Sequence, residues 1–512
     1  MKKNAHPLIR GAFILTLAGL ISRIIGFFYK IFLASLIGAE GIGIYQMVFP
    51  LYILCTSLAS AGIQTAISRF TAENLSTGRS QAARKLFRIS LAMAIFLSVI
   101  MSSLLFLLSE PISLYLLREK RCLPILRLMA IAIPFEVIHG CIAGYFLGQQ
   151  KSSIPAWLQL LEQAVRVGAT VLLYQILLQR QETPTPVLAA EGLLIAEFTV
   201  SLASLTVLAF SQPVSKNAPT AVSGPLLSRR QAIRCIVGVA FPITCNRLLL
   251  NVLQSIEAAM IPLRLQRYYE TSSTALSIYG VFTGMALPLI MFPCAITGSF
   301  SMVLLPSISE AHALKNDKKI AATIRSSLLL CLFLGTLCTA AFLQFGPALG
   351  LLLYHEDRVG SYLVTLAWIC PFLYLNTVTA SILHGLGKTM EVFLHNLAGL
   401  TLRLLFTWFL VPVFGIQGCL WGLLLSQLVT AMLSILTLKQ TINFNLPAAQ
   451  GLLYPAIVSL ISTTFLHLLQ TLLPVLARTD QWISLVLSAG IWACVVFLFS
   501  ASAVKRQQKG QL

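Results

Sequence analysis

The sequence predicts an all-α polytopic membrane protein with about 14 transmembrane helices. Composition is the first observation behind this prediction. Of the 512 residues, 57% are hydrophobic and 10% are charged, whereas a soluble domain is about 25% charged. The second observation is a series of roughly fourteen apolar runs of about 20 residues, the length that crosses a bilayer. No polar stretch between them is long enough for a sizeable soluble domain.

The runs follow one another with short connections. They cover 10–34, 44–69, 85–109, 123–148, 154–179, 187–211, 234–262, 277–305, 321–346, 359–385, 391–413, 415–438, 451–474 and 481–504. The first run follows Lys2 and Lys3 as in a signal peptide, but it is too long and lacks a convincing cleavage site. We therefore expect it to be retained as the first transmembrane helix.

A segment near the middle of the chain divides the runs into two halves. Residues 212–233 are rich in Pro, Ser and basic side chains, as in a linker. A faint repeat relates Ser22-Arg23-Ile24-Ile25 to Asn246-Arg247-Leu248-Leu249, and internal repeats are typical of transporters. We expect two six-helix lobes plus a final helix pair. The expected parts are an N-terminal lobe at 1–211, a cytoplasmic linker at 212–233, a C-terminal lobe at 234–440, and two helices with a cytoplasmic tail at 441–512.

The distribution of Lys and Arg predicts the orientation. With the N-terminus in the cytoplasm, about 22 cations lie inside and about nine outside, as the positive-inside rule requires. Both termini are then cytoplasmic. The formal net charge is +19, but the basic residues lie between apolar runs. They indicate topology and contacts with anionic lipid headgroups rather than nucleic-acid binding.

No motif for enzyme chemistry or a cofactor is evident. The sequence lacks a phosphate-binding Walker loop, a GxSxG elbow, an HExxH pair and an EF-hand loop. The 11 cysteines are scattered through apolar runs without a CxxC pair, which favours small core side chains over metal ligands. We expect no enzymatic activity, no metal and no cofactor, with coupling to an ion or to the membrane potential left open.

Two cations in the first run are the strongest functional signal. Arg23 and Lys30 are seven residues apart and share one face of a helix. A cation at mid-membrane costs about 2.5–3.5 kcal/mol on insertion scales, so such a side chain usually faces a wet cavity or a partner. Lys30 is near enough to the outer end to snorkel instead. Arg23 is at mid-span and is the better candidate for a cavity.

The seventh run carries a second polar stripe. Arg247, Asn251 and Gln254 step by four and three residues along one helix face. Arg247 is a candidate cavity cation, although it is close enough to the cytoplasmic side to snorkel. Glu257 follows toward the outer end, either as a counter-ion, as a proton-titrating group or in a structural pair.

Other charged residues in the runs are better explained by pairing. Glu162 and Arg166 are four residues apart, and we expect them to form an ion pair. Glu136 and His139, three apart, favour a buried pair over a proton relay. Glu197 lies near the end of its run, and the sequence assigns it no role.

A cavity with several cations and few acids attracts an anion. The forked donors of Arg suit phosphate, and attraction is stronger in a low-dielectric pocket than in water. A lipid-linked sugar pyrophosphate has such an anionic head and cannot cross a bilayer unaided. A cationic cavity that opens alternately to each side of the membrane would carry it.

Several blocks resemble a known family. The blocks are SRIIGFFYKIFLASLIGAEGIGIYQMVFP, GIQTAISRFTAE and the segments from PITCNRLLLN to PSISEA. They resemble the stage V sporulation protein B group of bacterial polysaccharide transporters. That group belongs to the superfamily of multidrug, oligosaccharidyl-lipid and polysaccharide exporters. The resemblance implies fourteen helices and outward translocation of an undecaprenyl-pyrophosphate-linked peptidoglycan or polysaccharide precursor across the bacterial cytoplasmic membrane. It also implies a role in spore cortex or cell-wall synthesis.

The resemblance also implies site residues. Ser22, Arg23, Gly26 and Phe27 match the Ser-Arg-x-x-Gly-Phe motif of the related lipid II flippases, whose Arg is implicated in the substrate cavity. The Arg-Asp pair that follows in those flippases is Tyr29-Lys30 here, and their arginine pair in the second helix has no counterpart, which favours the sporulation-type group. The expected substrate-binding residues are Arg23, Lys30, Arg247 and Asn251. The candidates for coupling or gating are Glu257, Arg69, Glu73 and Glu310.

The expected partners are the lipid-linked sugar substrate and membrane lipids, with cell-wall synthesis enzymes as further candidates. Two alternatives stay open. One is a cation-coupled multidrug exporter of the same superfamily, in which Glu257 would act on a cationic substrate. The other is a non-transporting membrane scaffold for cell-wall enzymes.

Overall fold

The computed structural model describes residues 7–211, 228–444, 449–472, 483–484, 486–494 and 496. This part of the chain is helical and has no strand. Thirteen of its helices are long and apolar enough to cross a membrane, which agrees with the expected all-α polytopic fold and comes close to the expected number. Most of the expected linker, 212–233, and half of the last run, 481–504, lie outside the described residues.

Two expected runs differ in detail. The first and second runs form one helix, α1 (Pro7–Ser76), interrupted at Gly38, where φ is 69° and ψ is 177°. A positive φ is readily adopted by glycine, so the chain bends there instead of needing a loop. The run at 277–305 is divided among consecutive helices on either side of Pro293. Proline cannot donate the backbone hydrogen bond that a continuous helix requires.

The chain divides into two compact units, Met1–Gly280 and Val281–Leu512. The boundary at Gly280 lies within the expected eighth run, and the expected lobe boundaries stay a prediction. The helices of unit 1 are α1, α2 (Ser80–Leu107), α3 (Ser109–Pro111), the π-helical η1 (Ile112–Leu116), α4 (Cys122–Gly148), α5 (Ser153–Gln179), α6 (Val187–Phe210), α7 (Arg229–Tyr269) and α8 (Ser272–Gly280).

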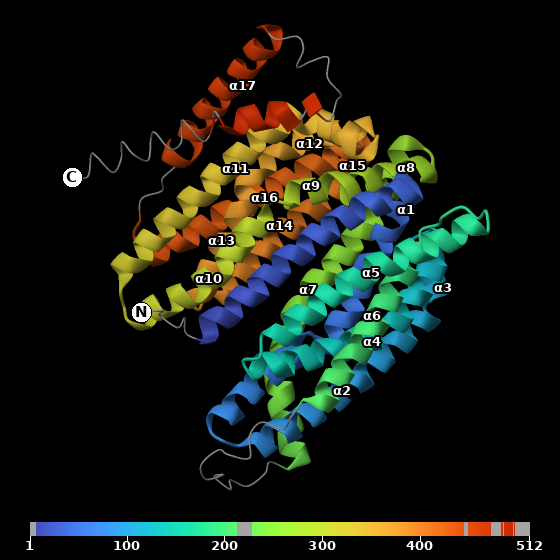
Figure 1. Ribbon diagram of the computed structural model, residues 1–512, viewed down its shortest axis with the longest axis vertical. Helices are drawn as coiled ribbons and strands as arrows, with labels where there is room; N and C mark the ends of the chain where they lie inside the picture. The colour runs from blue at the N-terminus through green and yellow to red at the C-terminus, as the bar shows by residue number, and fades with distance from the viewer. Residues whose placement is uncertain are drawn as a thin grey trace. The chain divides into compact units, whose positions relative to one another are not determined.

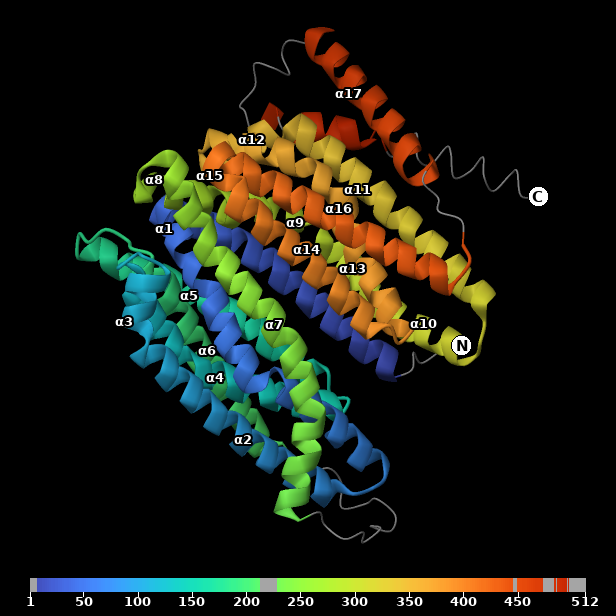
Figure 2. The same ribbon diagram turned by 180° about the vertical axis from the view of Figure 1, so that it is seen from behind.

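In unit 1, α2, α4, α5 and α6 pack side by side, and α1 lies against α4, α5 and α7 (Figures 1 and 2). The two halves of α1 have different neighbours. The first half runs parallel to α5, since Tyr29 meets Thr170 and Phe32 meets Tyr174. The second half runs antiparallel to α7.

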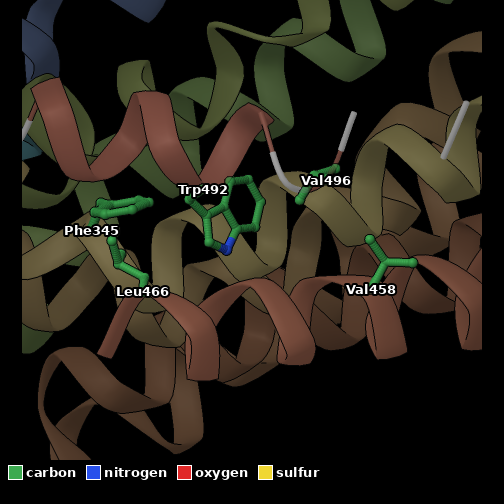
Figure 3. Close-up of a cluster of buried hydrophobic side chains, with 5 residues drawn as sticks. All are labelled: Phe345, Val458, Leu466, Trp492 and Val496. Carbon is green, nitrogen blue, oxygen red and sulfur yellow. The ribbon is translucent and has the colours of Figure 1, made fainter. Parts of the chain in front are cut away.

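The helices of unit 2 pack in a similar bundle. They are η2 (Val281–Ala286, π-helical), α9 (Leu287–Met291), α10 (Cys294–Ala313), α11 (Asp317–Tyr354), α12 (Asp357–Leu366), η3 (Ala367–Ile369, 3-10), α13 (Cys370–Gly385), α14 (Thr389–Phe409), α15 (Val411–Phe414), α16 (Ile416–Thr441), η4 (Ala449–Leu453, π-helical) and α17 (Tyr454–Leu472). Figure 3 shows a cluster of buried apolar side chains in this unit. In it, Trp492 packs edge-on against Phe345 of α11, with Val458 and Leu466 of α17 beside them.

Glycines allow the closest helix contact in unit 1. Gly43 of α1 and Gly280 of α8 lie where the two backbones touch. A Cβ at Gly43 would overlap the carbonyl oxygen of Leu276, and a Cβ at Gly280 would overlap that of Ala39. Small residues let helix backbones approach in this way, which is how helices in membranes gain most of their packing energy.

We predict that Gly280→Ala destabilises the protein. The added methyl group must push α8 away from α1, and overpacking of this kind typically costs about 1–3 kcal/mol. A thermal unfolding scan of the detergent-solubilised protein measures the effect. Gly168→Ala on α5 is the matched control, because a Cβ there meets no atom within 4 Å. Equal midpoints for the two variants would contradict the close contact.

Candidate functional site

The first half of α1 presents a face with two cations. Ser22 is buried, and the Tyr29 hydroxyl lies 3.1 Å from Oγ1 of Thr170 on α5. Arg23 and Lys30 lie about 100° around the helix from this packed side, and both are exposed. We call Arg23 and Lys30 the cationic face of α1. Gly26, Tyr29 and Phe32 therefore lie on the side of α1 that packs against α5, whereas Arg23 and Lys30 are uncovered.

The cationic face has open space beside it. Gly19 is one turn before Arg23 on the same side of the helix, and a Cβ built there meets no atom within 4 Å. A Cβ at Gly26 would only touch the side chain of Gln163 on α5, at 3.7 Å. A bulky group can therefore approach Arg23 along α1.

Arg247 and Asn251 of α7 have different surroundings. Arg247 is exposed, whereas Asn251 is half-buried and its Nδ2 donates a hydrogen bond of 2.8 Å to Oγ of Ser57 on α1. Asn251 thus ties α7 to the second half of α1. Arg247 is one turn before Asn251 on the same face of α7, outside the contact between Asn251 and Ser57.

None of the three candidate cations forms an ion pair within the described part of the chain. Within the residues that the structure covers, Arg23, Lys30 and Arg247 have no carboxylate within 4.0 Å. They contrast with Arg166, whose charge is fully engaged. An unpaired cation in a transmembrane helix is available for an anion that enters from outside the protein.

Arg166 is at the centre of a buried charged cluster. Its Nη2 lies 2.5 Å from Oε1 of Glu162 on the same helix, as the sequence predicted, and 3.2 Å from Oε1 of Glu197 on α6. The pair with Glu197 joins α5 to α6. Glu197, to which the sequence assigned no role, is 3% exposed.

The partner expected for His139 was wrong. Nδ1 of His139 lies 3.3 Å from Oε2 of Glu197 instead of pairing with Glu136 on its own helix. Glu136 adjoins Tyr52 and Thr56 of α1. Spacing along one helix cannot identify these partners, because they come from α6 and α1. We call Glu136, His139, Glu162, Arg166 and Glu197 the acidic cluster.

The other candidates are spread over the fold. Glu257 is buried on α7. Arg69 and Glu73 are exposed near the end of α1, and Glu310 is exposed near the end of α10 in the other unit. These residues stay candidates for coupling or gating.

Comparison with known proteins agrees with this architecture. The family model described as polysaccharide biosynthesis protein matches residues 8–312. The chain is 25% identical to stage V sporulation protein B of Bacillus subtilis (strain 168) over 455 residues, covering 88% of this chain and 87% of that protein. It is 22% identical to the lipid II flippase MurJ of the same organism over 506 residues, covering 94% and 89% of the two chains.

Solved structures place the fold in the same group. A lipid II flippase MurJ in an inward closed conformation superposes with a TM-score of 0.74 at 12% identity, covering 97% of this chain and 99% of that one. Together with the many apolar helices, these similarities indicate a multi-pass membrane transporter of the flippase type. The family match spans more than half of the sequence, and the chain therefore belongs to the polysaccharide biosynthesis protein family.

Proposed function

We propose that this protein is a flippase that moves a lipid-linked sugar precursor of the undecaprenyl-pyrophosphate type outward across the bacterial cytoplasmic membrane. The pyrophosphate is held by Arg23 and Arg247, with Lys30 as a third cation. Asn251 positions α7 through its hydrogen bond with Ser57. Transport proceeds by alternating access, with both termini of the chain in the cytoplasm.

The observation that carries this proposal is the set of unpaired cations. Cations without a carboxylate partner in apolar helices are costly unless a ligand or water compensates them. A pyrophosphate supplies several anionic oxygens, which Arg can bind through two parallel hydrogen bonds. The open space at Gly19 leaves room for the head of such a substrate beside Arg23.

The relatives support the same substrate class. One is named for stage V sporulation and another for flipping lipid II. The present chain keeps the Ser-Arg-x-x-Gly-Phe pattern at Ser22, Arg23, Gly26 and Phe27. We therefore favour a peptidoglycan or polysaccharide precursor used in spore cortex or cell-wall synthesis, with cell-wall synthesis enzymes as candidate partners.

Glu257, Arg69, Glu73 and Glu310 are proposed to act in coupling or gating. Three of them are exposed near helix ends, where they can change partners as the ends of the helices move. Glu257 is buried next to the polar stripe of α7. A role for Glu257 in binding a cationic drug would belong to the alternative multidrug exporter.

Removal of the Arg23 charge should abolish most transport. We predict that Arg23→Ala lowers the initial flipping rate by about tenfold to a hundredfold, since a charge-assisted hydrogen bond contributes about 1.5–3 kcal/mol. The measurement uses proteoliposomes with a fluorescent undecaprenyl-pyrophosphate-linked sugar, whose outward transfer is followed by dithionite quenching.

Two further variants serve as controls for the effect of Arg23→Ala. Arg88→Ala on α2 removes an equally exposed arginine away from the cationic face and should leave the rate unchanged. Arg23→Glu should inactivate a pyrophosphate carrier but leave a cation exporter or a scaffold working. Flipping by Arg23→Ala at the wild-type rate would eliminate the proposed site.

A bulky residue at Gly19 should obstruct the same site. A Cβ at Gly19 meets no atom within 4 Å, so we expect Gly19→Trp to fold normally and to lose flipping at least severalfold. Gly168→Trp is the matched control, because Gly168 also has no atom within 4 Å and faces away from Arg166 on α5. If both variants transport at the wild-type rate, the space beside Arg23 is lipid and not substrate.

A further inference from the structure

The side of α5 that packs against the first half of α1 is polar. Four contacts between the two helices define this side. They are Gly11 with Ser152, Gly26 with Gln163, Tyr29 with Thr170 and Phe32 with Tyr174. The members on α5 follow one another at intervals of 11, seven and four residues, so they lie on one side of that helix. All four are polar, although α5 as a whole is apolar enough to cross a membrane.

An opening interrupts this packing between its first and second contacts. Gln159 is four residues before Gln163 on the same side of α5, yet it is exposed. Gly19 is seven residues before Gly26 on the same side of α1, and a Cβ built on it meets no atom within 4 Å. Because the helices touch before and after this level, the exposed amide and the missing side chain mark a space between them. We call it the interhelical space.

The interhelical space borders the cationic face of α1. At about 100° per residue, Gly26 lies about 60° around the helix from Arg23 and about 60° from Tyr29, which touches α5. Gly26 is thus midway between the packed side of α1 and the side that carries the cations. Oε1 of Gln163 would lie 3.7 Å from a Cβ at Gly26. This side chain therefore reaches the edge at which Arg23 is uncovered.

The amides of Gln159 and Gln163 form no hydrogen bond with another residue in the described part of the chain. Polar side chains within membrane spans are costly and usually serve a function. A carboxamide both donates and accepts hydrogen bonds, whereas a phosphate oxygen at neutral pH only accepts them. Hydroxyl and acetamido groups, which also do both, are the better match. These are the polar groups of an amino sugar.

We propose that Gln159 and Gln163 form a carbohydrate subsite in the interhelical space. Their carboxamides bind hydroxyl or acetamido groups of the sugar that is attached to the pyrophosphate, while Arg23 holds the pyrophosphate at the edge of the same space. The subsite distinguishes a lipid that carries its sugar from the bare lipid pyrophosphate. This inference rests on the proposed flippase function, because it concerns the substrate of the same site.

The subsite is tested by binding, without transport. The full-length protein in detergent is titrated with undecaprenyl pyrophosphate and, separately, with undecaprenyl-pyrophosphate-linked N-acetylglucosamine, and each Kd is measured by microscale thermophoresis. We expect wild type to bind the sugar-bearing lipid about threefold to tenfold more tightly, the range that one neutral hydrogen bond supplies.

The double variant Gln159→Met, Gln163→Met should lose this preference. Methionine keeps the unbranched side chain but has no hydrogen-bond donor, so binding of undecaprenyl pyrophosphate should stay as in wild type. Gln175→Met is the matched control and should keep the preference, because Gln175 is an exposed glutamine about 120° around α5 from Gln163.

The single variant Gln159→Met decides the question if the double variant does not fold, since its exposed side chain has no partner in the described structure to lose. It should reduce the preference at least twofold. The absence of a preference in wild type, or an undiminished preference in the folded variant, would overturn the subsite. Equal weakening of both lipids would also overturn it, because the amides would then act on the pyrophosphate or on the fold.

Arg23→Ala separates failure of the subsite from failure of the proposed function. It should weaken the binding of both lipids equally, since both carry the pyrophosphate. If Arg23→Ala binds both lipids as wild type does while the glutamine variant loses the preference, the subsite stands and the pyrophosphate site at Arg23 fails. If Arg23→Ala weakens both lipids while the glutamine variant keeps the preference, the pyrophosphate site stands and the subsite fails.

Discussion

The ion pairs of Arg166 with Glu162 and Glu197 are the interaction on which unit 1 depends. The pair with Glu197 joins α5 to α6, whereas Glu162 is on α5 itself. Removal of one partner of a buried pair leaves an uncompensated charge and typically costs about 3–5 kcal/mol. Charged groups are unnecessary for packing these helices, since apolar residues of similar size would do as well or better. His139 of α4 also contacts Glu197, so charged side chains from three helices meet at this point.

Cations of unit 1 are used in two opposite ways. Arg166 is half-buried and paired with two carboxylates. Arg23 and Lys30 are on an uncovered side of α1, and no acid pairs with either in the described structure. Charge compensation therefore distinguishes Arg166 from the cations proposed to bind substrate more clearly than depth in the membrane does. Arg247 resembles Arg23 in this respect, because it too has no carboxylate partner among the described residues.

Much of the helical fold, and one of the ion pairs, could be predicted from the sequence. Runs of apolar residues predicted the helices because every backbone group in a bilayer must be satisfied within its own segment. The pair of Glu162 and Arg166 followed from helix periodicity. The bend at Gly38 was not predicted, because glycine is also common in transmembrane helices. Glu197 was missed because its partners are 31 and 58 residues away in sequence, on helices whose faces the sequence does not orient.

α1 connects the two features that the proposed mechanism needs. Its first half carries Arg23 and Lys30, and Tyr29 between them touches α5 above Arg166. Its second half, beyond Gly38, places Tyr52 against Glu136 and Ser57 against Asn251. The uncovered cations and the contacts with buried polar groups are therefore on one helix, on either side of the bend at Gly38.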